Sequence, residues 1–134
     1  MRSDSRAWHG GRVLVCEDNV LMADVVCDFV RGCGLQPVGP VGPLQSAMRA
    51  AREHALDGAV LDIKLIGRPC FPVCDILLAR HIPFMFLTAY GEAVLSLLPA
   101  RFRAARVISK PFEPSEMREA LSRMLGLDNP TLHA

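Results

Sequence analysis

The apolar residues of this chain gather in short runs that do not alternate regularly with polar residues. Three such runs are well defined, residues 12–16, 59–61 and 83–87, and residues 105–109 are expected to form the last strand. Runs of this kind are typical of strands that are buried on both faces of a parallel sheet. A fifth run, 35–41, is interrupted by Pro37, Gly39 and Pro40, which predicts a weak strand at an edge of the sheet.

Between these runs, apolar residues recur at helical spacing. Asn19 is expected to cap a first helix that runs to about Arg31. Its apolar positions are Leu21, Val25, Val26, Phe29 and Val30. Further helical segments are expected from Pro43, from Phe71 to Arg80, over residues 92–99 as at best a short helix, and from Pro114. Five strands that alternate with helices predict an α/β fold, a doubly wound parallel sheet, and at this length the flavodoxin-like (βα)5 order 2-1-3-4-5 is the natural candidate.

Composition narrows the class of protein. The chain has 134 residues, of which 51% are hydrophobic, and a formal net charge of +1, so one globular domain is expected. No basic run points to nucleic acid, and no apolar run reaches the ~20 residues of a membrane helix. The five cysteines are scattered without a metal-binding spacing, which indicates reduced, buried thiols in a cytoplasmic protein. We expect a flexible leader over residues 1–11, a folded domain over 12–125 and a C-terminal tail over 126–134.

Polar residues follow four of the predicted strands, at the point where each strand ends. These residues are Glu17 and Asp18, Asp62, Thr88, and Lys110. In the order 2-1-3-4-5 the four strands are neighbours about 4.8 Å apart, so their ends open into one cleft. Clustered carboxylates suit a hard cation such as Mg²⁺, and Asp62 is placed to attack phosphorus as a nucleophile. Lys110 would offset the charge of a transferred phosphoryl group, and Thr88 could donate a hydrogen bond to it.

These segments resemble the receiver domain of two-component response regulators. The match covers residues 12–125 and rests on four motifs in order: Val-Leu-Val-Cys-Glu17-Asp18-Asn19, Val-Leu-Asp62, Phe-Leu-Thr88-Ala89 and Ser-Lys110-Pro111-Phe112. The resemblance implies that Asp62 is the phospho-acceptor, charged by a sensor histidine kinase or a histidine phosphotransfer protein. Such a domain is not a conventional enzyme, because it catalyses only its own phosphorylation and dephosphorylation.

The resemblance also implies a role for each site residue. Asp18 and Asp62 would bind Mg²⁺, for which Mn²⁺ or Ca²⁺ can substitute in crystals. Glu17 would act largely through water, and the backbone carbonyl of Lys64 would complete the ligands. Thr88 and Lys110 would hold the phosphoryl group, and the Lys110-Pro111 peptide bond would be cis. Output would pass through contact with an unknown downstream protein, with no nucleic acid or membrane involved, from a stand-alone regulator that is a monomer or weak dimer.

The chain departs from the usual receiver pattern at one switch position. Receivers carry a Tyr or Phe three residues before the lysine, where this chain has Val107. Its only tyrosine, Tyr90, lies in the run Phe-Leu-Thr-Ala-Tyr-Gly (86–91), which resembles a subgroup of alphaproteobacterial regulators whose loop reads Phe-Ala-Thr-Gly-Tyr-Gly. We expect Tyr90, with the neighbouring Ala89 and Gly91, to replace the missing aromatic switch. The alternative is that Tyr90 is an exposed loop residue without a switching role.

Lys64 is a second departure, because it stands only two residues after Asp62. Its side chain could reach the phosphoryl group or pair with Glu17, and with Tyr90 it would tune the lifetime of the acyl phosphate. The alternative is that Lys64 is simply solvated at the rim of the cleft.

Three competing interpretations remain. A phosphorylation-independent pseudo-receiver is disfavoured because every site position is filled. A haloacid-dehalogenase-type phosphatase requires Asp-x-Asp, whereas the second position here is Lys64. A flavin- or nucleotide-binding flavodoxin relative would need a phosphate-cradling turn after the first strand, and Glu17 and Asp18 there repel phosphate.

Overall fold

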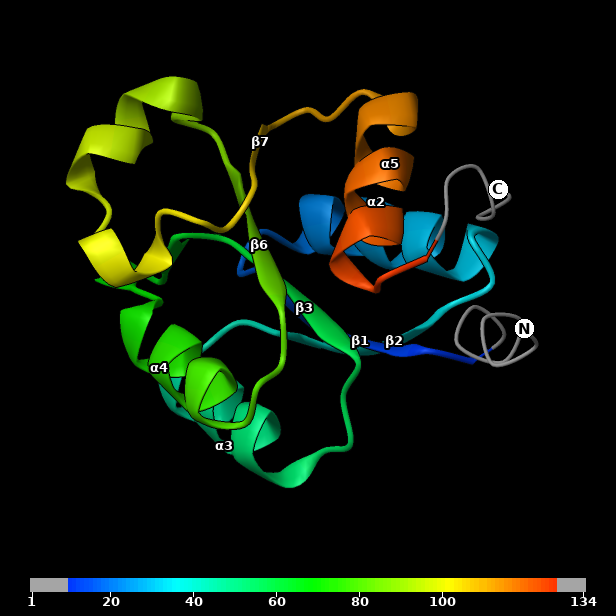
Figure 1. The fold of residues 1–134 in the computed structure, drawn as a ribbon, viewed down its shortest axis with the longest axis horizontal. Coiled ribbons are helices and arrows are strands. Elements are labelled where there is room, and N and C mark those ends of the chain that lie inside the picture. The colour runs from blue at the N-terminus through cyan, green and yellow to red at the C-terminus, as the bar shows by residue number, and fades with distance from the viewer. Residues whose placement is uncertain (1–9, 128–134) are drawn as a thin grey trace.

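The computed structural model describes residues 10–127, whose five parallel strands form one sheet in the order β2-β1-β3-β6-β7 (Figure 1). The strands are β1 (Arg12–Cys16), β2 (Gln36–Val41), β3 (Gly58–Leu61), β6 (Phe84–Thr88) and β7 (Val107–Ser109). Renumbered along the sheet, this is the order 2-1-3-4-5, so the predicted α/β fold is confirmed. The strand broken by prolines lies at an edge, as expected. The proposed leader and tail lie almost entirely outside the described residues.

Helices cover both faces of the sheet, with α2 and α5 together on one side and α3 and α4 on the other (Figure 1). Their bounds are α2 (Val20–Gly32), α3 (Leu44–Glu53), α4 (Phe71–Ala79) and α5 (Pro114–Met124). Alternate strand residues serve the two faces, because successive side chains of a strand point to opposite sides. Val13, Val15 and Val60 pack towards α2 and α5, whereas Leu14 and Leu61 belong to the other core.

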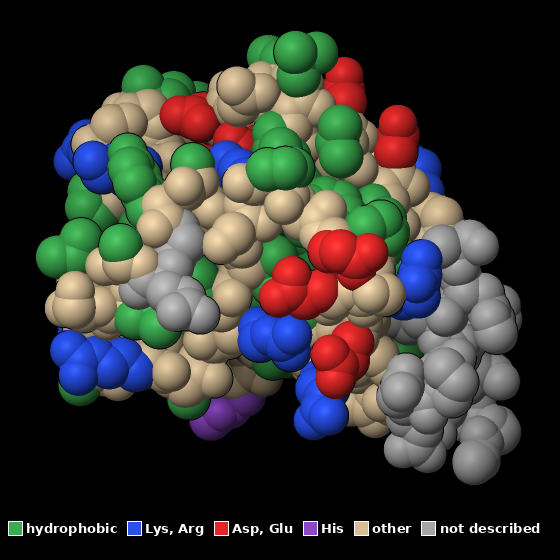
Figure 2. All heavy atoms as spheres, turned by 90° about the horizontal axis from the view of Figure 1, so that it is seen from above, with side chains coloured by type: hydrophobic (Ala, Val, Ile, Leu, Met, Phe, Trp, Pro, Cys, Tyr) green, Lys and Arg blue, Asp and Glu red, His purple; other side chains and the backbone are tan. Residues whose placement is uncertain are grey.

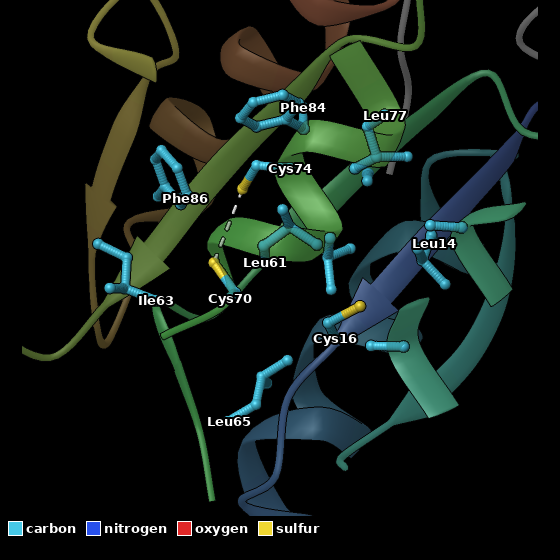
Figure 3. Close-up of a cluster of buried hydrophobic side chains, with 14 of the residues drawn as sticks. Leu14, Cys16, Leu61, Ile63, Leu65, Cys70, Cys74, Leu77, Phe84 and Phe86 are labelled. Carbon is cyan, nitrogen blue, oxygen red and sulfur yellow. Dashed lines mark hydrogen bonds between the residues drawn. The ribbon is translucent and has the colours of Figure 1, made fainter. Parts of the chain in front are cut away.

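The core between the sheet and α4 combines aromatic rings, aliphatic side chains and thiols (Figure 3). Phe84 and Phe86 of β6 pack edge to face, with ring centroids 5.6 Å apart. The Cys70 and Cys74 sulfurs lie 3.8 Å apart at the start of α4, and neither side chain is exposed. All five cysteines are free and buried, in agreement with the expectation of reduced core thiols.

The apolar face of α2 differs from the prediction. Leu21 is 78% exposed and Val25 is 50% exposed, while Ala23 and Cys27 are buried beside Val26. The first two turns of the helix are apolar almost all round, so periodicity could not identify the stripe that contacts the sheet. Leu21 and Val25 therefore do not contribute to the core.

Two connecting segments carry structure of their own. The segment between Asp62 and α4 contains a small antiparallel hairpin of β4 (Lys64–Leu65) and β5 (Arg68–Pro69). After β6 come two 3₁₀ helices, η1 (Gly91–Leu97) and η2 (Ala100–Phe102), where a short helix was expected. Among residues 10–127 no helix is both long and apolar enough to cross a membrane.

The end of α5 rests against the start of β3. A Cβ atom built on Gly58 would lie only 2.5 Å from Met124 Cε, so the glycine permits this close packing. The N–H of Gly10, just before β1, donates to the carbonyl of Gly34, just before β2. Both ends of the described chain therefore lie at the edge of the sheet where the parallel strands begin.

Candidate functional site

The carboxyl ends of β1, β3, β6 and β7 meet at one edge of the sheet and bring the predicted site residues together. Backbone hydrogen bonds fix the strand ends, because the Asp62 N–H donates to Cys16 O at 2.9 Å and the Lys110 N–H donates to Thr88 O at 2.8 Å. The Lys110-Pro111 peptide bond is cis. Glu17, Asp62, Thr88 and Lys110 thus lie together at this edge of the sheet.

Three carboxylates cluster at this edge. Glu17, Asp18 and Asp62 each offer an oxygen, and these three oxygens lie within 4.8 Å of one another. Glu17 is buried, Asp62 is partly buried and Asp18 is exposed. The Asn19 N–H donates to Glu17 Oε2 at 3.0 Å, while the Ile66 N–H donates to Asp18 Oδ2 at 2.6 Å.

Lys110 is the cation that balances this cluster. Its Nζ lies 2.6 Å from Glu17 Oε1 in an ion pair and donates a hydrogen bond to Asp62 Oδ2 at 3.0 Å. Burial raises the pKa of the Glu17 carboxyl, and the Asp62 charge acts in the same direction. Burial alone lowers the pKa of Lys110, but its close contacts with the charged Glu17 and Asp62 carboxylates together outweigh burial and raise that pKa.

The donor set suits a hard divalent cation. Glu17 Oε1 is buried and, among residues 10–127, receives no hydrogen bond of good geometry despite the nearby lysine. Three carboxylates face one ammonium, which leaves the cluster negative when all are ionised. Carboxylate oxygens at such spacing are the ligands that Mg²⁺ accepts in proteins.

Thr88 is the last residue of β6 at this edge of the sheet and is fully buried. Its Oγ1 accepts a hydrogen bond of 3.1 Å from the N–H of Tyr90, so its hydroxyl proton stays available for another acceptor. Ala89 and Tyr90 are exposed, and η1 begins at Gly91. The threonine hydroxyl is therefore linked directly to the backbone of the loop that carries the tyrosine.

Lys64 does not pair with Glu17, which lies against Lys110 instead. The Lys64 Nζ lies 5.6 Å from the centre of the Tyr90 ring, within reach of a cation–π contact. Both side chains border a cavity of about 260 Å³ whose other walls include Phe71 and Leu98. Lys64 and Tyr90 are thus neighbours on the wall of one cavity.

Two backbone groups of the site were not anticipated from sequence. The Asn19 residue was expected only as a helix cap, and its side chain indeed accepts from Met22 N, but its own N–H also binds Glu17. The Ile66 N–H reaches Asp18 across 48 residues of chain. A hydrogen bond from a main-chain group carries no side-chain signature, so sequence offers no signal for it.

A family model described as the response regulator receiver domain matches residues 13–122. The chain belongs to this family. It is a two-component receiver domain and not a conventional enzyme, which removes the phosphatase and flavodoxin alternatives.

Solved structures agree with this assignment. SdrG from Sphingomonas melonis Fr1 is 33% identical, with a TM-score of 0.75 over 87% of this chain and 98% of that one. The BeF3-activated conformation of SdrG from Pseudomonas melonis Fr1 matches with a TM-score of 0.70 over 85% of this chain and 95% of that one, also at 33% identity. The PhyR receiver domain of Erythrobacter litoralis is 28% identical, with a TM-score of 0.77 over 96% of this chain and 99% of that one.

Curated relatives are longer than this chain. The DNA-binding response regulator MtrA of Mycobacterium tuberculosis is 33% identical over 107 residues, which are 79% of this chain and 46% of MtrA. This chain spans about half the length of the curated relatives that it matches. A receiver domain of a Pseudomonas aeruginosa sensor histidine kinase, solved with a magnesium ion in its active-site cleft, shares the fold at 23% identity, a TM-score of 0.74 and coverage of 87% of this chain and 98% of that one.

Proposed function

We propose that Asp62 accepts a phosphoryl group from the phosphohistidine of a sensor histidine kinase or a histidine phosphotransfer protein. The observation that carries this proposal is the pairing of Asp62 Oδ2 with Lys110 Nζ at 3.0 Å inside the carboxylate cluster. Glu17, Asp18, Asp62 and the backbone carbonyl of Lys64 would hold Mg²⁺. The bound ion would offset negative charge on the carboxylates and on the transferred group.

The residues of the chain have separate tasks in the transfer. An Asp62 carboxylate oxygen attacks phosphorus, so that an O–P bond forms while the N–P bond to the donor histidine breaks. The Lys110 ammonium, already between two carboxylates, lies where it can also balance a phosphoryl oxygen. The Thr88 hydroxyl can donate its free proton to a second phosphoryl oxygen while it accepts from Tyr90 N–H.

The hydrogen bond between the Tyr90 N–H and Thr88 Oγ1 supports Tyr90 as the replacement for the aromatic residue missing at Val107. When the Thr88 hydroxyl donates to a phosphoryl oxygen, its oxygen moves towards that group and still accepts from the Tyr90 N–H, so the 88–91 loop shifts with it. Lys64, held over the Tyr90 ring, moves with it and changes how water reaches the acyl phosphate. Output then follows from contact of this altered face with a downstream protein, in the cytoplasm and from a monomer or weak dimer.

Mixed surface charge accords with an output through protein contact. On the face shown in Figure 2, acidic and basic side chains are interleaved over one part, and hydrophobic side chains gather over another. A surface that binds nucleic acid would instead carry clustered Lys and Arg.

Intact-mass spectrometry after incubation with acetyl phosphate tests the proposal. Wild type should gain one phosphoryl group only with Mg²⁺, Asp62→Asn should gain none, and Asp28→Asn should behave as wild type. Asp28 is a matched control because it is an exposed carboxylate that pairs with Arg31 on α2. If wild type gains nothing and also fails to bind beryllofluoride, the chain is a pseudo-receiver.

The switch is tested separately by ¹⁵N NMR spectra recorded with and without beryllofluoride. In Tyr90→Ala, the shift changes that beryllofluoride causes in η1 should shrink, whereas those at the strand ends should persist. An unchanged pattern of shifts in the variant would assign Tyr90 to an ordinary exposed loop position.

A further inference from the structure

The hairpin that follows Asp62 ends in a tight two-residue turn. β4 and β5 pair through Lys64 with Pro69 and Leu65 with Arg68, which leaves residues 66 and 67 as the turn. Both turn residues have positive φ, 52° at Ile66 and 77° at Gly67, as a type I′ hairpin requires. The hairpin is anchored to the body of the domain, because Leu65 is fully buried and the Cys70 N–H donates to Ile63 O at 2.7 Å.

This turn delivers a main-chain N–H to the carboxylate cluster. The Ile66 N–H donates to Asp18 Oδ2 at 2.6 Å, a short distance that suits a bond to an ionised acceptor. Within residues 10–127, the Asp18 side chain has no other hydrogen bond or ion pair. Asp18 is exposed, so without this bond its side chain would be free to exchange rotamers in solvent.

The turn keeps its conformation although the backbone of Ile66 is strained. A β-branched residue at positive φ is costly, since its Cβ crowds the following carbonyl. The Ile66 side chain is 62% exposed, so burial does not offset that cost. Strained backbone that persists beside a cluster of functional groups points to a function for the geometry that it holds.

We propose that the main-chain N–H of Ile66 is a positioning group for Asp18, which fixes the carboxylate in the rotamer that faces Glu17 and Asp62. One N–H occupies only one of about four acceptor positions of the carboxylate, so the others remain for a cation. The hairpin thereby preorganises the cation site before the cation arrives. This inference rests on the proposed function in one respect only, which is the identity of the cation as Mg²⁺.

A backbone ester isolates the contact. The α-hydroxy acid analogue of isoleucine, introduced at position 66 of the full chain by nonsense suppression, removes one N–H and keeps the side chain. Glycolic acid at position 67 is the matched control, because the Gly67 N–H makes none of the hydrogen bonds found in the described part of the chain. Ile66→Gly is a second control, since glycine keeps the N–H and adopts positive φ without strain.

The rotamer of Asp18 and the affinity for Mg²⁺ are the two measurements that test the positioning role. In metal-free protein, the Hα–Hβ couplings of Asp18 should report one rotamer in wild type, in the position-67 ester and in Ile66→Gly, but averaging in the position-66 ester. In calorimetric titration, Mg²⁺ should bind about tenfold more weakly to the position-66 ester, as expected for a lost hydrogen bond to a charged group, and within about twofold of wild type in the two controls.

The couplings do not depend on the proposed function, so the two ideas can fail separately. Averaged couplings in wild type, or a single rotamer in the position-66 ester, would overturn the positioning role even if phosphorylation proceeds. Mg²⁺ affinity that is unchanged or increased in the position-66 ester would also overturn it. If wild type shows a single rotamer that the ester loses, yet binds no Mg²⁺, the positioning role stands and the assignment of the cation fails.

Discussion

Replacing Lys110 with methionine should strongly destabilise the metal-free domain. Methionine keeps the length of the side chain but removes the charge that lies 2.6 Å from Glu17 Oε1 and 3.0 Å from Asp62 Oδ2. At an effective dielectric constant of 20, these two attractions amount to about 6 and about 5.5 kcal/mol. The cost of desolvating the ammonium, which is only 13% exposed, offsets much of that sum.

The net loss follows from what the substitution leaves behind. Two carboxylates with oxygens within 4.8 Å of each other would repel by about 3 kcal/mol or more if both stayed ionised. Removing one partner from a buried charge pair costs about 3–5 kcal/mol in measured cases. We therefore expect a loss of about 3 kcal/mol at pH 7, since Glu17 can take up a proton and limit the damage.

Urea unfolding followed by far-ultraviolet circular dichroism, with EDTA present, measures this loss. Lys64→Met is the matched control, because the only other lysine of the chain is exposed and should lose less than about 1 kcal/mol. The double variant Lys110→Met/Glu17→Gln should recover at least about 1 kcal/mol relative to Lys110→Met. A loss below about 1 kcal/mol for Lys110→Met, or one equal to that of Lys64→Met, would refute the reasoning.

Three further predictions concern stability. Asn19→Ala should cost about 1 kcal/mol in urea unfolding, because the Asn19 side chain caps α2 through Met22 N, and Asn19→Ser should recover most of the loss. His81→Gly should stabilise the domain by about 0.5 kcal/mol, since His81 has φ 59° at the end of α4, whereas His81→Ala should bring no gain. The pKa of Glu17 is raised on folding, so its contribution to stability is present below its ordinary value of 4.5 and is lost as pH rises through the folded pKa. The stability of Glu17→Gln relative to metal-free wild type should therefore increase from pH 4.5 to pH 7, and a difference independent of pH would contradict that assignment.

Much of the fold could be predicted because the strands are easy to recognise in the sequence. Uninterrupted apolar runs such as Phe84–Leu87 have few other uses in a small domain, and a polar residue at the end of each run marks where it leaves the sheet. Once the order of strands was inferred, the convergence of Glu17, Asp62, Thr88 and Lys110 followed from the spacing of strands alone.

What sequence could not predict depends on local geometry. The hairpin at residues 64–69 was not predicted because its turn is Ile-Gly, whereas type I′ turns are usually formed by Asn-Gly or Asp-Gly. The exposure of Leu21 and Val25 was missed because apolar residues cover most of the first turns of α2. Sequence allowed Lys64 to reach the phosphoryl group, to pair with Glu17 or to stay in solvent, and in the structure Glu17 pairs with Lys110. Which long side chain reaches Glu17 depends on local geometry, and spacing along the chain does not encode that choice.

The packing of Gly58 against Met124 has a practical consequence for attaching a tag or a surface tether to this domain. Both ends of the described chain lie where the strands begin, and the site lies where they end, so the length of β1, five residues or about 16 Å, separates them. An affinity tag, a fluorophore or a surface tether joined directly at residue 10 or residue 127 would approach from the edge of the sheet where the strands begin. Protein immobilised at that edge should therefore leave Asp62 accessible to a phosphodonor. Its phosphorylation could then be followed on a surface.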